Sequence, residues 1–149
     1  MPAPSARRGG RPKARDLVVR VLYEAEITGD EARDVLDLAF GRFRFTEDGR
    51  GYAERLLRAA TAHRKRLDAT LADVLENWEL SRLATVIRAV LRLATAELLY
   101  LKETPARVVL DEAVRLAHRY GDDQSAAFVN GVLDPVARRV RAGELERRG

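Results

Sequence analysis

The chain has 149 residues, of which 46% are hydrophobic and 34% are charged, and its formal net charge is +4. This length corresponds to one ordinary domain, and the composition is typical of a globular protein rather than a disordered chain. Because cysteine is absent, a disulfide framework and a cysteine-ligated zinc site are excluded, and we expect a reducing, cytoplasmic location. No run of about 18 apolar residues occurs and none follows the charged N-terminus, so we expect neither a membrane span nor a signal peptide.

The charge is distributed unevenly along the chain. Residues 1–15 carry no acidic group and five basic ones, namely Arg7, Arg8, Arg11, Lys13 and Arg15. Residues 138–149 sum to +3, which leaves −4 for residues 16–137. We therefore expect a flexible basic arm at 1–10, a helical domain at 11–137 and a basic extension at 138–149. Basic ends on a mildly acidic body favour a polyanionic partner.

The first half of the chain has helical periodicity and no segment that alternates like a strand. We expect one helix from about Pro12 to Gly29 and a shorter one that uses Asp30 as its N-cap. Three glycines between residues 41 and 51 favour a loop there. A long helical pattern then occupies residues 52–78.

The second half contains the most apolar helix, over residues 82–101, which we expect to lie at the centre of the fold. Pro105 separates it from a helix over 107–120, and Ser125 is the expected N-cap of the last helix. We expect Pro135 to kink or end that helix, and Gly131 to mark the close approach of a neighbouring helix. The fold class that follows is all-α, a compact orthogonal bundle of about six to seven helices.

Residues suited to catalysis are sparse. The two histidines, His63 and His118, are far apart and lack metal-spaced partners, so each is expected to be structural or superficial. The paired acids Asp122 and Asp123 precede a helix, where carboxylates favour the helix dipole. No phosphate-cradling loop is present. We therefore predict no enzyme activity, no metal site and no cofactor.

Two segments have the chemistry of nucleic-acid binding. Arginines in the arm suit phosphates and unpaired bases, and the glycines between them let the backbone follow a flexible strand, although a solvated tail that only aids solubility has the same composition. The segment 41–45 alternates arginine with Phe43 and Phe45. This pattern fits either a stacking platform for bases or a clamp that holds the loop on the core.

Three runs in the C-terminal half resemble the transcription antitermination factor NusB family. These runs cover residues 88–99, 108–117 and 128–134, the last reading Phe-Val-Asn-Gly-Val-Leu-Asp. At the N-terminus, Ala14-Arg15-Asp16 and Leu22-Tyr23 resemble the opening helix of the family. Residues 30–77 resemble it only in helical pattern.

The resemblance implies an RNA-binding factor that works without catalysis in the RNA polymerase antitermination complex. Such proteins pair with a small-subunit ribosomal protein, called NusE in this role, and bind the boxA element of nascent ribosomal RNA, which also supports ribosomal RNA maturation. The residues that would contact RNA are Arg7, Arg8, Arg11, Lys13, Arg15, Tyr23, Ser125 and Phe128. The residues that would contact the protein partner are Tyr23, Ile87, Arg88 and Gln124. Ile87 and Gln124 stand where relatives usually have acidic residues, which puts partner affinity in question rather than the fold.

Two other functions stay open. The chain is alternatively a protein-interaction module of the transcription and ribosome machinery without sequence-specific RNA binding. A similar domain also precedes the catalytic part of some ribosomal RNA methyltransferases, but we expect no methyl-donor domain here. The sequence does not decide whether the protein is a monomer or a homodimer, and the extension 138–149 is expected to add non-specific phosphate contacts.

Overall fold

The computed structural model describes residues 10–77 and 79–147. Within these ranges the chain forms α-helices and one short 3-10 helix, with no β-strand, which confirms the all-α prediction. The helices are α1 (Gly10–Thr28), α2 (Ala32–Arg42), α3 (Glu47–Ala62), α4 (Arg64–Val74), η1 (Leu80–Arg82), α5 (Thr85–Tyr100), α6 (Ala106–Tyr120) and α7 (Asp123–Arg141). None of them combines the length and the apolarity needed to cross a bilayer.

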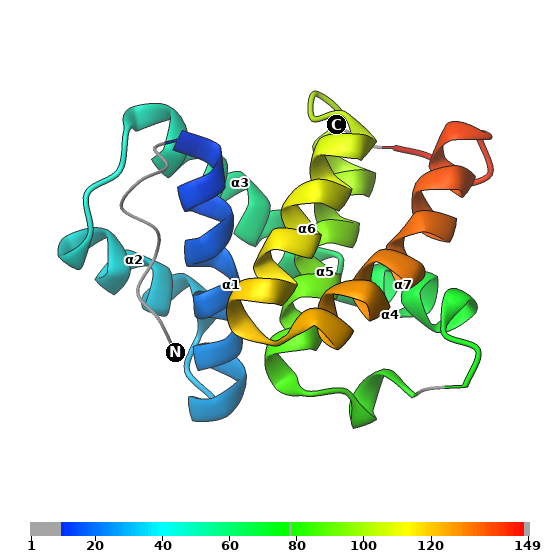
Figure 1. The fold of residues 1–149 in the computed structure, drawn as a ribbon. Coiled ribbons are helices and arrows are strands. Elements are labelled where there is room, and N and C mark those ends of the chain that lie inside the picture. Colours follow the sequence, from blue (N-terminus) through cyan, green and yellow to red (C-terminus); the bar gives the residue numbers. More distant parts are fainter. Residues whose placement is uncertain (1–9, 78, 148–149) are drawn as a thin grey trace.

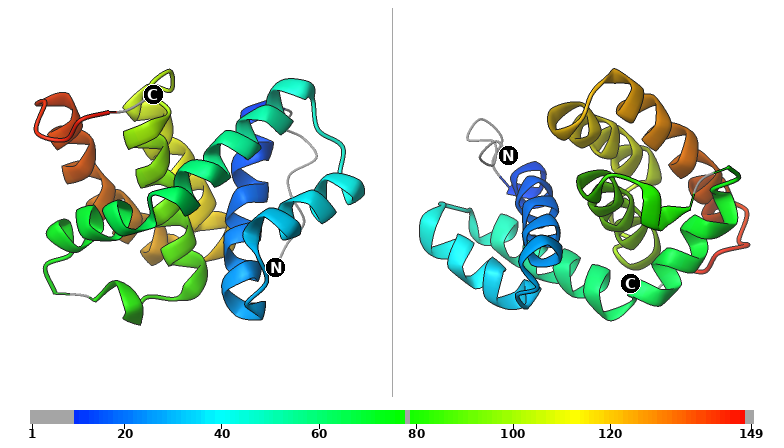
Figure 2. Two further views of the ribbon diagram at one scale, coloured as in Figure 1. Left: turned by 180° about the vertical axis from the view of Figure 1, so that it is seen from behind. Right: turned by 90° about the horizontal axis from the view of Figure 1, so that it is seen from below.

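The helices form two groups that meet along α1 and α5. Figure 1 shows α1, α2 and α3 together on one side of the molecule and α5, α6 and α7 on the other. Seen from behind and from below, α3 and α4 follow one another across the rear face of the molecule, from the first group to the second (Figure 2). Helix α5 contacts α1, α3, α4, α6 and α7, and twelve of its residues are buried, which confirms its predicted central place.

Helix α1 ends where the sequence predicts. Gly29 has φ +80, a left-handed conformation that glycine adopts without strain, and its N–H donates to the Ala25 carbonyl at 2.9 Å. The helix begins at Gly10, two residues earlier than expected. The predicted arm residues Arg7 and Arg8 lie outside the described residues.

The predicted loop over 41–51 was too long. Helix α2 continues to Arg42, and α3 already begins at Glu47, so only residues 43–46 connect them. Thr46 is the N-cap of α3, and its hydroxyl accepts a hydrogen bond from the Gly49 N–H at 3.0 Å. This cap and the acidic residues of the first turn outweigh the cost of two glycines in the helix. The expected cap Asp30 was also one residue early, since α2 has Glu31 at its N-cap position.

The pattern over 52–78 belongs to two helices rather than one. His63 has φ −114 and ψ 23, values that interrupt the α-helix. It is the C-cap residue of α3 and also the N-cap residue of α4. Apolar periodicity continues across this break, because Leu57 and Ala60 before it and Leu67 and Leu71 after it all face the same core. Periodicity alone therefore could not reveal the interruption.

Three expectations for α7 need correction. Its N-cap is Asp122, which accepts a hydrogen bond from the Ser125 N–H at 2.7 Å, while Ser125 lies in the first turn. The helix continues through Pro135 to Arg141. Proline has no backbone N–H, so the Gly131 carbonyl lacks its usual donor four residues later in the helix. Gly131 is exposed, and water can donate to this carbonyl instead. Gly131 is not a close-packing position, since a Cβ there would meet nothing within 4 Å.

The C-terminal extension is partly structural. Residues 138–141 complete α7, and the chain then turns at Gly143, which has φ +77. The Arg147 guanidinium donates to carbonyls at the end of α5 and beyond it, including Leu101 and Thr104 at 3.1 Å each. A cation at these carbonyls offsets the negative end of the helix dipole, so Arg147 acts as a cap for α5.

Candidate nucleic-acid interface

The first turn of α1 presents Arg11 and Lys13 at the surface, beside the start of α3. The Arg11 side chain is 36% exposed, its Nε lies 3.3 Å from an Asp48 carboxylate oxygen, and its guanidinium lies 4.5 Å from the centre of the Tyr52 ring. The Lys13 ammonium donates to the Arg44 carbonyl and lies 4.8 Å from the Phe45 ring centre. Both cations are thus held in place by the protein and remain partly accessible.

Arg15 does not belong to this accessible set. It is 2% exposed, and its guanidinium donates to both carboxylate oxygens of Glu97 on α5, at 2.7 to 3.0 Å. Such a side chain has no surface to offer a phosphate, so the structure does not support the prediction that Arg15 contacts RNA. The position along α1 explains the difference, because every residue from Ala14 to Val19 is buried, whereas Arg11 and Lys13 come before this stretch.

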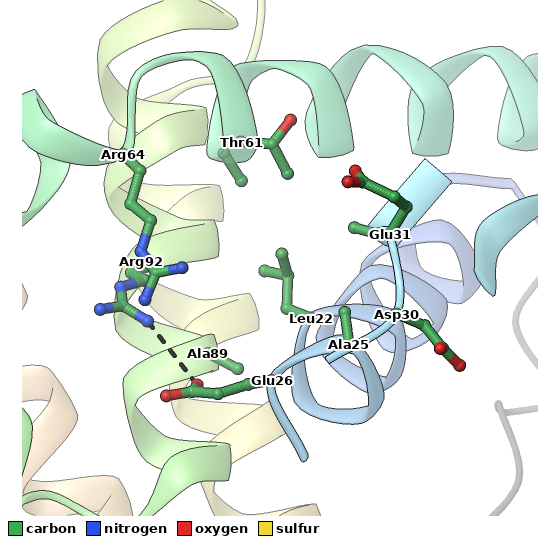
Figure 3. Close-up of a pocket in the computed structure, with 11 residues that line it drawn as sticks. Leu22, Ala25, Glu26, Asp30, Glu31, Thr61, Arg64, Ala89 and Arg92 are labelled. Carbon is green, nitrogen blue, oxygen red and sulfur yellow. Dashed lines mark ion pairs between the residues drawn. The ribbon is translucent and has the colours of Figure 1, made fainter. Parts of the chain in front are cut away.

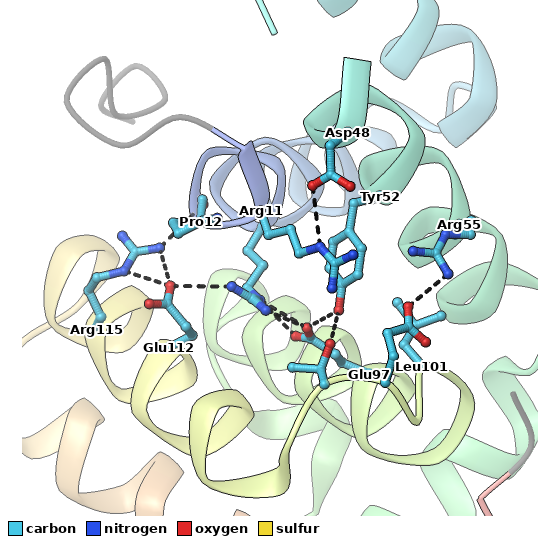
Figure 4. Close-up of polar contacts among 12 residues, drawn as sticks. Arg11, Pro12, Asp48, Tyr52, Arg55, Glu97, Leu101, Glu112 and Arg115 are labelled. Atoms are coloured by element: carbon cyan, nitrogen blue, oxygen red, sulfur yellow. Dashed lines mark hydrogen bonds and ion pairs between the residues drawn. The ribbon is translucent and has the colours of Figure 1, made fainter. Parts of the chain in front are cut away.

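Glu97 is the centre of a buried polar cluster that joins α1, α3 and α5 (Figure 4). The Tyr52 hydroxyl bonds to Glu97 and lies 2.6 Å from the Thr104 hydroxyl. Burial alone would lower the pKa of the Arg15 guanidinium, but the hydrogen bonds and charge of Glu97 raise it above the ordinary value. Burial raises the pKa of the Tyr52 hydroxyl, and the Glu97 carboxylate raises it further. The cluster therefore keeps Arg15 charged and Tyr52 neutral.

Helix α6 fixes the same end of α1 from the other side. Asp16 is fully buried, and the Arg115 guanidinium lies 3.3 Å from its carboxylate. Arg115 also donates to the Pro12 carbonyl at 3.4 Å and pairs with Glu112 at 2.8 Å. Figure 4 shows the contacts of Arg115 with Pro12 and Glu112 beside Arg11. Three helices thus determine where the first turn of α1 lies.

A sequence signal for this cluster exists and was missed. Glu97 is the only acidic residue in the apolar helix over 85–100, and a carboxylate on such a helix is seldom buried without a cationic partner. In the first helix, Arg15 is the cation that lies among the apolar residues, and it is therefore the candidate partner for Glu97. The charge count grouped Arg15 with the basic residues of the N-terminus, and it was predicted to contact RNA instead.

The aromatic loop over 43–45 is a clamp rather than an open platform. Phe45 packs edge-to-face against Phe40 with ring centres 5.6 Å apart, and it carries Lys13 on its face. The Arg20 guanidinium lies 6.0 Å from the Phe43 ring centre. Both rings are half-buried and already engaged by cations of the protein itself, which favours the structural alternative.

Four of the predicted contact residues come together in a groove between the starts of α5 and α7. This α5–α7 groove is open and has a volume of about 370 Å³. Its lining consists of Leu83, Ala84, Ile87, Asp122, Gln124, Ser125 and Phe128. Ile87 and Phe128 are apolar, whereas Gln124 is exposed and the Ser125 hydroxyl bonds to Asp122 at 2.8 Å. The groove joins residues predicted for RNA with residues predicted for the protein partner.

The hydroxyl and backbone N–H of Ser125 also stabilise the negative charge of Asp122 at this groove. The Ser125 N–H and hydroxyl both donate to Asp122 and hold the pKa of its carboxyl below the ordinary value. Asp122 is therefore an anion over the neutral pH range and supports the N-terminus of α7.

The two remaining predicted residues, Tyr23 and Arg88, lie outside the groove. Tyr23 is half-buried on α1. Arg88 donates to the Ser81 and Leu83 carbonyls at 3.1 and 2.6 Å and pairs with Glu26 on α1 at 2.5 Å. Arg88 is thus mainly a link between α5, η1 and α1.

A second hollow lies where the two helix groups meet (Figure 3). Leu22, Ala25 and Ala89 form its apolar floor, and Arg64 and Arg92 line one side. Arg92 lies 3.7 Å from Glu26 and also pairs with Asp68 on α4 at 2.8 Å. These ion pairs of Arg92 tie α1, α4 and α5 together.

The described residues contain no group of three histidine, cysteine or acidic side chains that could hold a metal ion.

A helical bundle with accessible cations at one helix start and an open groove at another defines a class of macromolecule-binding domain. A family model described as NusB family matches residues 12–138, and the chain belongs to the NusB family.

Relatives and solved structures agree with this assignment. The chain is 36% identical over 132 residues to the transcription antitermination protein NusB of Desulfitobacterium hafniense, covering 87% of this chain and 89% of the relative. It is 41% identical over 130 residues to the NusB protein of Pseudothermotoga lettingae, covering 86% and 91%.

Among solved structures, T. maritima NusB superimposes with a TM-score of 0.78 at 35% identity, covering 88% of this chain and 92% of that one. A chain from a crystal structure of the antitermination factors NusB and NusE in complex with double-stranded RNA superimposes with a TM-score of 0.77. Its identity is 30%, and the match covers 84% of this chain and 93% of that chain.

Proposed function

We propose that this protein is a non-catalytic RNA-binding transcription antitermination factor, which acts with the ribosomal protein NusE on the boxA element of nascent ribosomal RNA. The observation that carries the proposal is the similarity to a chain solved together with NusE and RNA, over 84% of the present chain. The accessible cations Arg11 and Lys13 supply phosphate-binding chemistry at the start of α1. The basic residues Arg7 and Arg8 precede them.

In this proposal the α5–α7 groove is a second binding site, beside the cations at the start of α1. Its apolar residues Ile87 and Phe128 suit a side chain of the protein partner or an unstacked base, while Gln124 supplies a hydrogen-bonding rim. Tyr23 and Arg88 then lie at the margin of the partner surface. Arg15 has a positioning role, because it holds the helix that carries Arg11 and Lys13.

The alternative is a protein-interaction module without sequence-specific RNA binding. One observation favours it: Arg11 already pairs with Asp48, and Lys13 already donates to the Arg44 carbonyl. A phosphate must compete with these internal partners.

Titration of labelled boxA RNA and of a scrambled RNA of equal length separates the two functions, with fluorescence anisotropy as the readout. Each titration is made with and without NusE. An antitermination factor prefers boxA, and the preference strengthens when NusE is present. Equal affinity for both RNAs in both conditions, together with a stable NusE complex, establishes the interaction module instead.

A further inference from the structure

A row of cations follows the outer face of α3. Residues 51, 55, 58 and 62 are all exposed and recur at the spacing of a single helical stripe, and they include Arg55 and Arg58. Lys65 is exposed in the first turn of α4, just beyond the break at His63, and lines a hollow together with the last residues of α3. We call Arg55, Arg58 and Lys65 the α3 track.

The α3 track starts beside the accessible cations of α1. The guanidinium groups of Arg11 and Arg55 lie 4.5 and 5.2 Å from the centre of the same Tyr52 ring. Figure 4 shows the two arginines on either side of that ring. Arg55 and the end of α3 at Ala62 are seven residues apart, so the helix carries the row roughly 10 Å away from the start of α1. The two sets of cations therefore form one continuous surface.

The far end of the α3 track has positive charge that the protein does not neutralise. Within the part of the chain that the structure describes, neither Arg58 nor Lys65 has a carboxylate within 4.0 Å, whereas Arg55 pairs with Glu103. The hollow at the α3–α4 corner is lined by residues 61–66 and Asp68. Asp68, its one carboxylate, is bound by Arg92 at 2.8 and 3.1 Å.

An aromatic surface lies at the same corner. The exposed His63 ring stacks on Tyr100 with centres 3.9 Å apart and an angle of 8° between the planes. The Arg66 guanidinium lies 5.3 Å from the Tyr100 ring centre and donates to its hydroxyl at 3.0 Å. Cations spaced along a helix and ending at a stacked ring suit an extended polyanion with bases better than a single small anion.

We propose that the α3 track binds the backbone of the single-stranded RNA that flanks the segment held at the start of α1. The contact is independent of sequence, because it involves phosphates rather than base edges. This proposal rests on the RNA-binding function proposed above and extends the RNA path along α3 to the α3–α4 corner.

The test compares a track variant with a control of equal charge. The track variant is Arg58→Ala with Lys65→Ala, and the control is Arg33→Ala with Arg82→Ala, two exposed cations on α2 and η1. Each protein is titrated over a range of salt with boxA RNA alone and with boxA RNA extended by eight uridines at its 5′ or 3′ end. Circular dichroism confirms that both variants keep the helical fold.

We expect one extended RNA to bind wild type with a steeper salt dependence than the bare element. The track variant should reduce that slope by about 1.4, which is roughly 0.7 for each lost phosphate contact. The control and the bare element should keep the wild-type slope. Equal slopes for the track variant and the control on every RNA would overturn the proposal.

The test of the α3 track can be distinguished from the test of the function proposed above. If wild type fails to prefer boxA over scrambled RNA, sequence-specific binding is wrong. The same comparison on a uridine 16-mer then still decides whether Arg58 and Lys65 contact an RNA backbone.

Discussion

At the scale of single residues, the chain separates cations of the same sequence segment into different roles. Arg11 and Lys13 remain partly exposed, whereas Arg15 is buried against Glu97. A buried ion pair is costly to break, because removing one partner leaves an uncompensated charge. The arginine that looks like part of a basic arm is therefore needed for the fold.

Arg15→Ala should lower the free energy of unfolding by about 3–5 kcal/mol, the cost of breaking a buried pair. Arg33→Ala is the matched control, because Arg33 pairs with Asp37 at the surface and such pairs contribute about 0–1 kcal/mol. Urea denaturation followed by circular dichroism measures both. A loss below 1 kcal/mol for Arg15→Ala would show that the Glu97 cluster is not structural.

Asp122 gives a pH-dependent prediction. Its pKa is lower in the folded protein, because the Ser125 N–H and hydroxyl bind the charged form. The stability that it contributes is therefore present above its unfolded pKa, about 3.9, and is lost as pH falls through its folded pKa. Asp122→Ala should unfold at lower urea than wild type at pH 6, and the difference should narrow as the pH is lowered towards 3.

Asp122→Asn is the control for this effect, because asparagine caps helices about as well as aspartate but does not titrate. Its difference from Asp122→Ala should stay constant over the same pH range. A wild-type advantage that is unchanged between pH 6 and pH 3 would contradict the capping role of the charge.

At the scale of elements, the start of α1 is held by a close contact with α3. A Cβ on Gly49 would lie 2.9 Å from the Gly10 carbonyl oxygen and 3.1 Å from the Thr46 hydroxyl oxygen. Neither atom can move easily, since one belongs to the backbone and the other caps α3. Gly51, in the same helix turn, has open space around it.

Gly49→Ala and Gly51→Ala should therefore have opposite effects on stability. Alanine improves helix propensity by about 1 kcal/mol, and Gly51→Ala should gain up to that amount. Gly49→Ala should lose about 1–3 kcal/mol, because overpacking outweighs propensity. Thermal unfolding of both variants measures the difference. Equal stabilisation by the two substitutions would show that α1 and α3 are not in close contact at Gly49.

Most of the helices could be predicted from the sequence. The predictions failed where contacts between distant parts of the chain determine the structure or the role of a residue. Apolar periodicity identified α1, the central α5, and α6, because each has a stripe that only a helix can bury. It joined α3 to α4, because the buried face continues past His63. The prediction that Arg15 contacts RNA failed, because its partner Glu97 is 82 residues away in the sequence. The α5–α7 groove was foreseen only as separate residues, and the α3 track was not foreseen.

At the scale of the whole molecule, the two helix groups share ion pairs that cross their boundary. Arg92 pairs with Glu26 and Asp68, and Arg115 pairs with Asp16. These contacts connect α1 to α4, α5 and α6, so the accessible cations of α1 and the α5–α7 groove are held in one arrangement. A partner or an RNA strand that touches both sites meets a preorganised surface, which reduces the entropy lost on binding.

The central claim is that RNA is held by the accessible cations at the start of α1. The most direct measurement is the salt dependence of boxA RNA affinity for wild type and for Arg11→Ala with Lys13→Ala, keeping Arg15 so that the fold is preserved. Arg33→Ala with Arg82→Ala is again the control of equal charge. We predict that the α1 variant weakens binding and reduces the slope by about 1.4, while the control matches wild type. An α1 variant that is folded and binds with the wild-type affinity and slope would contradict the claim.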